Sequence, residues 1–227
     1  MKTVKLTIDN DPDTENPCEQ GGWVVHSFGR RHSSFAEPSS LGLGELDEFG
    51  EPKVHDIGLR RKLEVGTAFL LSYSEHGNCT WSLKGEGTQC RWDSVRVAGL
   101  LVWSGSPKDC GYSNSPDGKW HKECWKTDYE SREKNAREFL KAYTEWCNGS
   151  CYCYSLVEYD EATGVEGEHV DSCSGYIGDE SLVSAIKEAV KGNKVKVVEV
   201  TGDAEWLSKY HVFNEEPKKE PVGVSPA

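Results

Sequence analysis

The sequence predicts a single α+β domain: a mostly antiparallel sheet with one long amphipathic helix and one shorter helix packed on it. Three observations predict this class. Residues 67–73 and 95–103 are apolar runs rich in Leu, Val and aromatic residues, bounded by turn-forming residues as buried strands are. Residues 128–147 repeat apolar side chains at three- and four-residue spacing, as an amphipathic helix does. Residues 152–159 and 169–176 are strand-like and flank a turn, which predicts a hairpin.

The first half of the chain alternates predicted strands with turn-rich segments. Apolar and polar residues alternate over residues 4–8, which predicts a first strand, and residues 21–28 (GGWVVHSF) predict a second. Residues 33–52 are rich in Gly, Ser, Pro and acidic residues, which indicates a long loop or a loosely packed helical turn. Residues 104–127 are also turn-rich, and we interpret them as an insertion before the long helix.

The second half begins with the long helix, and its end is marked by Asn148 and Gly149. Its apolar positions are Ala136, Phe139, Leu140, Tyr143 and Trp146. Residues 181–191 predict the shorter helix, and residues 194–201 predict an edge strand with lysines on its outer side. The domain therefore spans residues 1–213, and the Pro- and charge-rich residues 214–227 are predicted to be a disordered tail.

The chain is acidic, with 26 Lys and Arg against 38 Asp and Glu and a formal net charge of -12. This charge repels nucleic-acid phosphates and anionic lipid. An acidic surface that keeps the protein soluble is one interpretation. The other is that clustered acids imitate the phosphates of DNA, but the acidic residues form no regular helical stripe. We therefore expect no nucleic-acid partner except through mimicry.

Nine cysteines are an odd number, and the N-terminus lacks the apolar core of a signal peptide. No apolar run approaches the roughly 20 residues that cross a bilayer. We therefore expect a cytoplasmic protein, inside a host cell, with reduced thiols and no membrane partner. In that compartment clustered cysteines suggest metal binding or catalysis before disulfides.

One cysteine cluster surrounds the long helix and suggests a structural zinc ion. The candidate ligands are Cys110, His121, Cys124 and Cys151, with Cys147 and Cys153 nearby in sequence. Their spacing matches no standard zinc ligand pair, so ordinary buried or free thiols are the alternative, and no cofactor is the simpler expectation.

A second candidate is a small thiol-dependent enzyme. Cys173, His76 and Asp93 are residue types that serve as nucleophile, base and orienting carboxylate. The alternative is structural: Cys173 packs in a strand, and the triplet Trp92, Asp93 and Ser94 begins a strand, with the tryptophan covering the core.

Aromatic and basic residues suggest a surface that binds a partner protein. Trp120 and Trp125 lie in the polar 104–127 segment, where exposed aromatic side chains would anchor an interface. A small local core that closes this loop is the alternative. Arg30 and Arg31 form a local positive site in an otherwise acidic chain.

Several short motifs follow one another along the chain, at His26, Tyr73, Gly77, Trp92, Asp93, Ser94, Gly99, Asn148, Gly149, Val170, Asp171, Ser172, Cys173, Gly175, Tyr176 and Gly178. In this order they resemble a family of uncharacterised small proteins encoded by bacteriophages and other mobile elements. Ser174 stands where the family usually has tryptophan, and residues 104–127 are an insertion that the family pattern lacks. The resemblance implies an accessory protein that binds a host protein, including as an inhibitor of host defence.

Overall fold

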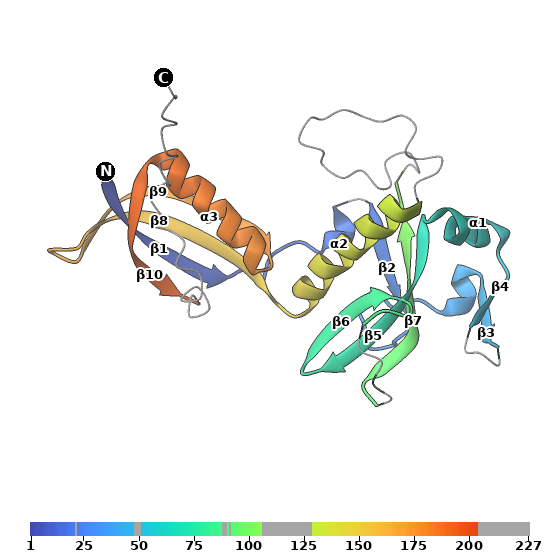
Figure 1. Ribbon diagram of the computed structural model, residues 1–227. Coiled ribbons are helices and arrows are strands. Elements are labelled where there is room, and N and C mark those ends of the chain that lie inside the picture. Colours follow the sequence, from blue (N-terminus) through green and yellow to red (C-terminus); the bar gives the residue numbers. More distant parts are fainter. Residues whose placement is uncertain (21, 48–50, 88–89, 91, 106–128, 204–227) are drawn as a thin grey trace, which may run out of the picture. The chain divides into compact units, whose positions relative to one another are not determined.

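The computed structural model describes residues 1–20, 22–47, 51–87, 90, 92–105 and 129–203 (Figure 1). These residues form a mixed α/β fold with antiparallel sheets and three α-helices, which confirms the predicted class at that level. The sequence predicts one domain over residues 1–213, and contacts within the chain group it into two compact units. Unit 1 contains residues 1–14 and 149–227, and unit 2 contains residues 15–148. Within the described ranges, no helix is both long and apolar enough to cross a membrane.

Unit 1 is a four-stranded sheet with one helix packed on it (Figure 1). Its elements are β1 (Lys2–Asn10), β8 (Cys151–Asp160), β9 (Val165–Ile177), α3 (Asp179–Asn193) and β10 (Val195–Gly202). The strand order is β10-β1-β8-β9, in which β1 runs antiparallel to β8 and parallel to β10. The predicted hairpin is therefore confirmed as β8 and β9, and the last predicted strand lies at the sheet edge.

The core of unit 1 lies between α3 and one face of this sheet. Val4, Leu6 and Ile8 alternate along β1, so all three point to the same face, and each is 0% exposed. On α3, Leu182 and Ile186 are four residues apart and are fully buried against them. Burying each of these large aliphatic side chains contributes about 1.5–3 kcal/mol, so the sheet and helix stabilise each other.

Unit 2 is built on an antiparallel sheet in the order β2-β7-β5-β6. Its main elements are β2 (Trp23–Ser27), β5 (Ala68–His76), β6 (Asn78–Leu83), β7 (Ser94–Trp103) and α2 (Tyr129–Cys147). The runs at 67–73 and 95–103 become β5 and β7, which pair with each other, so their prediction as strands is confirmed. Strand β7 is buried from Ala98 to Leu101 and exposed at its start. The sequence did not predict β6, whose segment was interpreted as polar residues between those strands.

Both faces of the unit 2 sheet are covered, which explains the continuous apolar runs. Phe69 and Leu71 of β5 pack on the face that holds α2. Ala68 packs on the opposite face with Leu100 of β7 and Leu43. This second face lies against α1 (Ile57–Val65) through Leu59.

Helix α2 lies on the first face through side chains at helical spacing. Ala136, Leu140 and Tyr143 are buried in one cluster with Leu101 of β7. Positions four and three residues apart fall on one side of a helix, so these three contact the sheet together. The large aromatic ring of Tyr143 is 0% exposed.

Hydrogen bonds attach α2 to both edge strands of this sheet. On β2, Trp23 Nε1 donates to Asn135 Oδ1 at 2.7 Å. On β6, the Trp81 backbone N–H donates to Thr144 Oγ1 at 3.0 Å. These polar contacts fix the helix across the sheet, whereas apolar packing alone would tolerate a shift along it.

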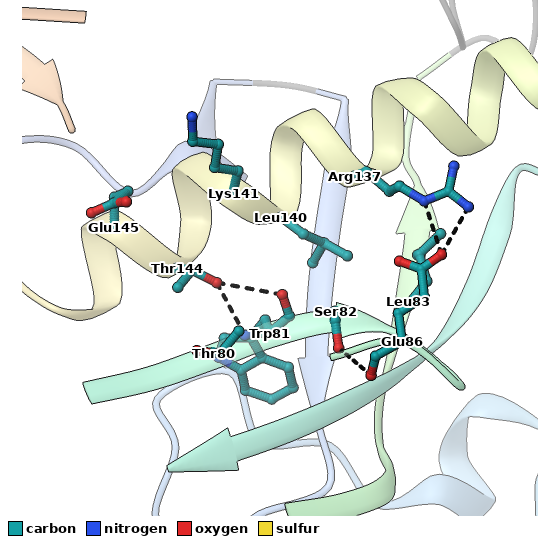
Figure 2. Close-up of a pocket in the computed structure, with 10 residues that line it drawn as sticks. All are labelled: Thr80, Trp81, Ser82, Leu83, Glu86, Arg137, Leu140, Lys141, Thr144 and Glu145. Atoms are coloured by element: carbon teal, nitrogen blue, oxygen red, sulfur yellow. Dashed lines mark hydrogen bonds and ion pairs between the residues drawn. The ribbon is translucent and has the colours of Figure 1, made fainter. Parts of the chain in front are cut away.

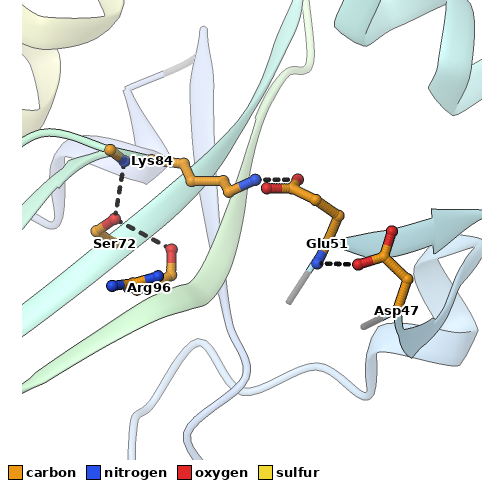
Figure 3. Close-up of polar contacts among 6 residues, drawn as sticks. Asp47, Glu51, Ser72, Lys84 and Arg96 are labelled. Carbon is orange, nitrogen blue, oxygen red and sulfur yellow. Dashed lines mark hydrogen bonds and ion pairs between the residues drawn. The ribbon is translucent and has the colours of Figure 1, made fainter. Parts of the chain in front are cut away.

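The prediction for residues 33–52 was a long loop or a loosely packed helical turn, and the described residues of this segment match the helical turn only in part. They contain a short 3-10 helix (Pro38–Leu41) and the strand β3 (Leu43–Leu46), which pairs with β4 (Pro52–Val54). Leu43 is 2% exposed, so this segment contributes to the core despite its polar composition. Figure 3 shows how Glu51, which lies next to β4, forms an ion pair with Lys84 and donates its backbone N–H to Asp47 Oδ1 at 2.9 Å.

Candidate functional site

A groove of about 710 Å³ opens on unit 2. Its walls come from the segment that follows β2 and from β5, β6 and β7, all within this unit. The lining residues are Ser27, Phe28, Gly29, Arg31, His32, Tyr73, Glu75, Trp81, Val95, Val97 and Ala98. A groove of this size with apolar walls and a few polar groups is typical of a binding site.

Three aromatic rings pack together at the groove. The Trp81 ring centroid lies 4.8 Å from that of Tyr73 and 5.3 Å from that of His32. Tyr73 and Trp81 are cross-strand partners on β5 and β6, so their side chains project from the same face of the sheet. Burial, together with the hydrogen bond that its hydroxyl donates to Glu75 Oε2 at 2.8 Å, raises the pKa of Tyr73. Tyr73 therefore stays neutral at physiological pH.

His32 is held by Ser34 and is neutral near pH 7. Its Nδ1 accepts the Ser34 backbone N–H at 3.2 Å, so the ring hydrogen of the neutral imidazole resides on Nε2. Burial lowers the pKa of His32, because desolvation disfavours the charged imidazolium. The groove thus gains a neutral donor group instead of a second positive charge beside Arg31.

The two predicted arginines lie at different places. Arg31 is exposed and lines the groove. Arg30 is also exposed and forms an ion pair with Glu37 at 3.5 Å. With Glu75 on β5, Arg31 supplies the groove with one positive and one negative side chain.

The start of β7 exposes two large apolar side chains. Val95 is 53% exposed and lines the groove, and Trp92, three residues earlier, is 85% exposed. The prediction that the Trp92 triplet begins a strand agrees with β7, which begins at Ser94. The prediction that Trp92 covers the core is wrong, because the residue lies in the turn before the strand and projects into solvent.

Two of the three predicted catalytic residues lie together. His76 Nδ1 is 3.4 Å from Asp93 Oδ2, and both side chains are solvent-accessible. Cys90, which the sequence analysis did not single out, donates its thiol to the same Asp93 oxygen at 3.6 Å. Cys173 lies on β9 in unit 1 and is exposed, with its thiol directed to the Ser174 carbonyl at 3.7 Å.

The predicted metal ligands fall mostly outside the described residues. Cys110, His121 and Cys124 lie there, as do Trp120 and Trp125 of the predicted contact surface. Cys151, at the start of β8, is 4% exposed and belongs to unit 1. Among the side chains that the structure describes, no three His, Cys, Asp or Glu residues form a group that could hold a metal ion.

A smaller pocket of about 270 Å³ lies between α2 and β6 (Figure 2). Arg137 and Glu86 form an ion pair at 2.8 Å at one end, and Thr144 contacts the Trp81 backbone at the other. Trp81 lines both this pocket and the larger groove.

The larger groove is the better candidate site, because it combines greater volume, clustered aromatic rings and two opposite charges. The signal that points to it in the sequence is the basic run Arg30, Arg31 and His32 directly after a predicted strand. Comparisons with protein-family models, curated proteins and solved structures found no match.

Proposed function

We propose that this chain is a non-enzymatic binding protein that holds a partner protein at the groove of unit 2. The observation that supports it best is the exposure of Val95 and Trp92, 53% and 85%, beside a concave aromatic surface. Large exposed apolar side chains next to a pocket are the features that anchor protein interfaces. The opposite charges of Arg31 and Glu75 would orient the partner segment.

A protein of the host cell is the partner class that the sequence favours. The motif resemblance to phage and mobile-element accessory proteins supports this class, with inhibition of a host defence protein as the consequence. The formal charge of -12 argues against direct binding of nucleic acid, because phosphates would be repelled. A positively charged host surface that normally contacts nucleic acid is compatible with this charge.

The test uses two matched valine substitutions and a pull-down from host lysate. Val95→Asp places a charge in the groove, whereas Val165→Asp makes the same change at a 61% exposed valine on β9 of unit 1. We expect the wild type and Val165→Asp to retain one stoichiometric partner, and Val95→Asp to weaken its affinity at least about tenfold. Trp92→Ala should act in the same direction.

Two results would count against the proposal. A partner that Val95→Asp and Trp92→Ala retain as well as the wild type would show that binding occurs elsewhere on the chain. Absence of any stoichiometric partner in the wild-type sample would contradict the binding function itself. Circular dichroism of each variant checks that the fold is retained.

A further inference from the structure

Two thiols of unit 2 lie together where α2 ends against the edge strand β6. Cys79 lies on β6 and is the cross-strand partner of Glu75, so its side chain projects from the same sheet face as Trp81. Cys147 is the last residue of α2. Both side chains pack against the same apolar cluster.

The residue after Cys147 holds this arrangement in place. Asn148 Oδ1 accepts the Cys79 backbone N–H at 2.8 Å, and Asn148 Nδ2 donates to the Cys79 carbonyl at 2.9 Å. One side chain therefore satisfies both backbone groups of Cys79 on the open side of the edge strand. Because Cys147 directly precedes this amide, the two thiols stay adjacent as long as α2 is docked.

We propose that Cys79 and Cys147 are a disulfide-forming pair that reacts with low-molecular-weight disulfides such as oxidised glutathione. The pair is 68 residues apart in sequence, so no local motif indicates it. Both cysteines are free and neither is fully buried, which leaves the pair accessible to a small oxidant. The inference is independent of the partner-binding function.

The two thiols have different roles in the exchange. The Cys147 thiol donates a hydrogen bond to the Cys79 sulfur, which lowers the pKa of Cys79, while the same bond and burial raise the pKa of Cys147. The Cys79 thiolate therefore attacks the small disulfide first and releases one small thiolate. Cys147 then loses its proton and attacks the Cys79 sulfur, which releases the second small thiol. Two protein thiols are oxidised and one small disulfide is reduced to two thiols.

Formation of this bond would join the end of α2 covalently to β6. The sulfurs must approach to about 2 Å, and the two Asn148 hydrogen bonds keep Cys147 next to Cys79 while they do so. Because the crosslink closes a long loop, it restricts the unfolded chain strongly. We expect the Tm of the oxidised protein to rise by roughly 5–10 °C.

The test treats the full-length protein with oxidised glutathione at about pH 8, near the ordinary pKa of a thiol. Free thiols are counted by alkylation and mass spectrometry, and the linked peptides are mapped without reduction. We expect the loss of two thiols of nine, one linked peptide that joins Cys79 to Cys147, and full reversal by reductant. Cys79→Ser and Cys147→Ser should each abolish the link.

Two control variants test the specificity of the pair. Cys18 packs against the same cluster, and Cys153 is a partly exposed cysteine of unit 1. Cys18→Ser and Cys153→Ser should each still form the link. A different crosslink in the wild type, or a glutathione adduct on Cys79 that Cys147 never resolves, would overturn the proposal. The wild-type map decides between these results even if a variant folds poorly.

Discussion

Replacing Asn148 by alanine should destabilise unit 2, because this side chain connects the end of α2 to the edge strand β6. The amide makes two part-buried hydrogen bonds with the backbone of Cys79, at 2.8 and 2.9 Å. Asn148→Ala removes both bonds and leaves the N–H and the carbonyl of Cys79 without this partner. The helix itself is little affected, because it ends at Cys147.

The magnitude follows from the two lost bonds. A typical intramolecular hydrogen bond contributes about 0.5–1.5 kcal/mol to stability. Cys79 is only partly buried, so water can replace part of the loss and the expected cost is about 1–2 kcal/mol. With an m value of roughly 1.5–2 kcal/mol/M, the urea midpoint of unit 2 should fall by roughly 0.5–1.3 M.

Tryptophan fluorescence during urea unfolding is a suitable assay, because seven of the eight tryptophans belong to unit 2. The matched control is Asn78→Ala, which removes an exposed asparagine next to Cys79 on the same strand. We expect the control to change the free energy of unfolding by less than about 0.5 kcal/mol. If Asn148→Ala costs no more than Asn78→Ala, the two hydrogen bonds do not hold α2 on the sheet and the reasoning is refuted.

Two further predictions concern unit 1 and the pH dependence of unit 2. Gly202→Ala should lower the stability of unit 1 by about 2 kcal/mol or more, since its φ is +82° and an added Cβ would lie 1.9 Å from the Ile8 carbonyl oxygen. Gly192 lies on α3, and a Cβ added there would have no heavy atom within 4 Å, so Gly192→Ala should instead stabilise unit 1 by about 0.5–1 kcal/mol. Thermal denaturation followed by circular dichroism distinguishes the two variants. Burial lowers the pKa of His26 and His32, so below about pH 6.5 the unfolded chain binds more protons than the folded one. The urea concentration at the unfolding midpoint of unit 2 should therefore fall as the pH is lowered from about 7.5 to 5.5, and it should fall less steeply in His32→Gln. A wild-type midpoint that does not change with pH would contradict this.

The sequence predicts strands well where the fold buries both faces and poorly where only alternate positions are buried. The runs at 67–73 and 95–103 were recognised because apolar residues occupy both sides of β5 and β7. Strand β6 was missed because its buried positions, Trp81 and Leu83, are separated by polar residues in a segment rich in turn formers. Its alternation was the available signal, but such a short pattern competes with the interpretation as a turn.

The candidate groove could be predicted only in fragments. Arg31 and His32 stood out as a basic run, but their position beside Tyr73 and Glu75 depends on the order β2-β7-β5 in the sheet. That order is set by contacts between residues far apart in sequence, and hydrophobic periodicity carries no information about it. Trp92 shows the opposite error, because a large aromatic residue was assigned to the core and is exposed at the turn before β7.

The division into two units also depends on contacts between residues far apart in sequence. Strand β1 pairs with β8 so that Asn10 lies opposite Tyr152, and the Asp11 N–H donates to the Cys151 carbonyl at 2.8 Å. The chain therefore leaves the unit 1 sheet and returns to it at neighbouring positions, with all of unit 2 in the connection. Loop-closure entropy grows only slowly with loop length, so a compact unit fits between two paired strands at small cost. A local pattern can thus predict the short hairpin β8–β9, whereas the β1–β8 pairing has no signature along the chain.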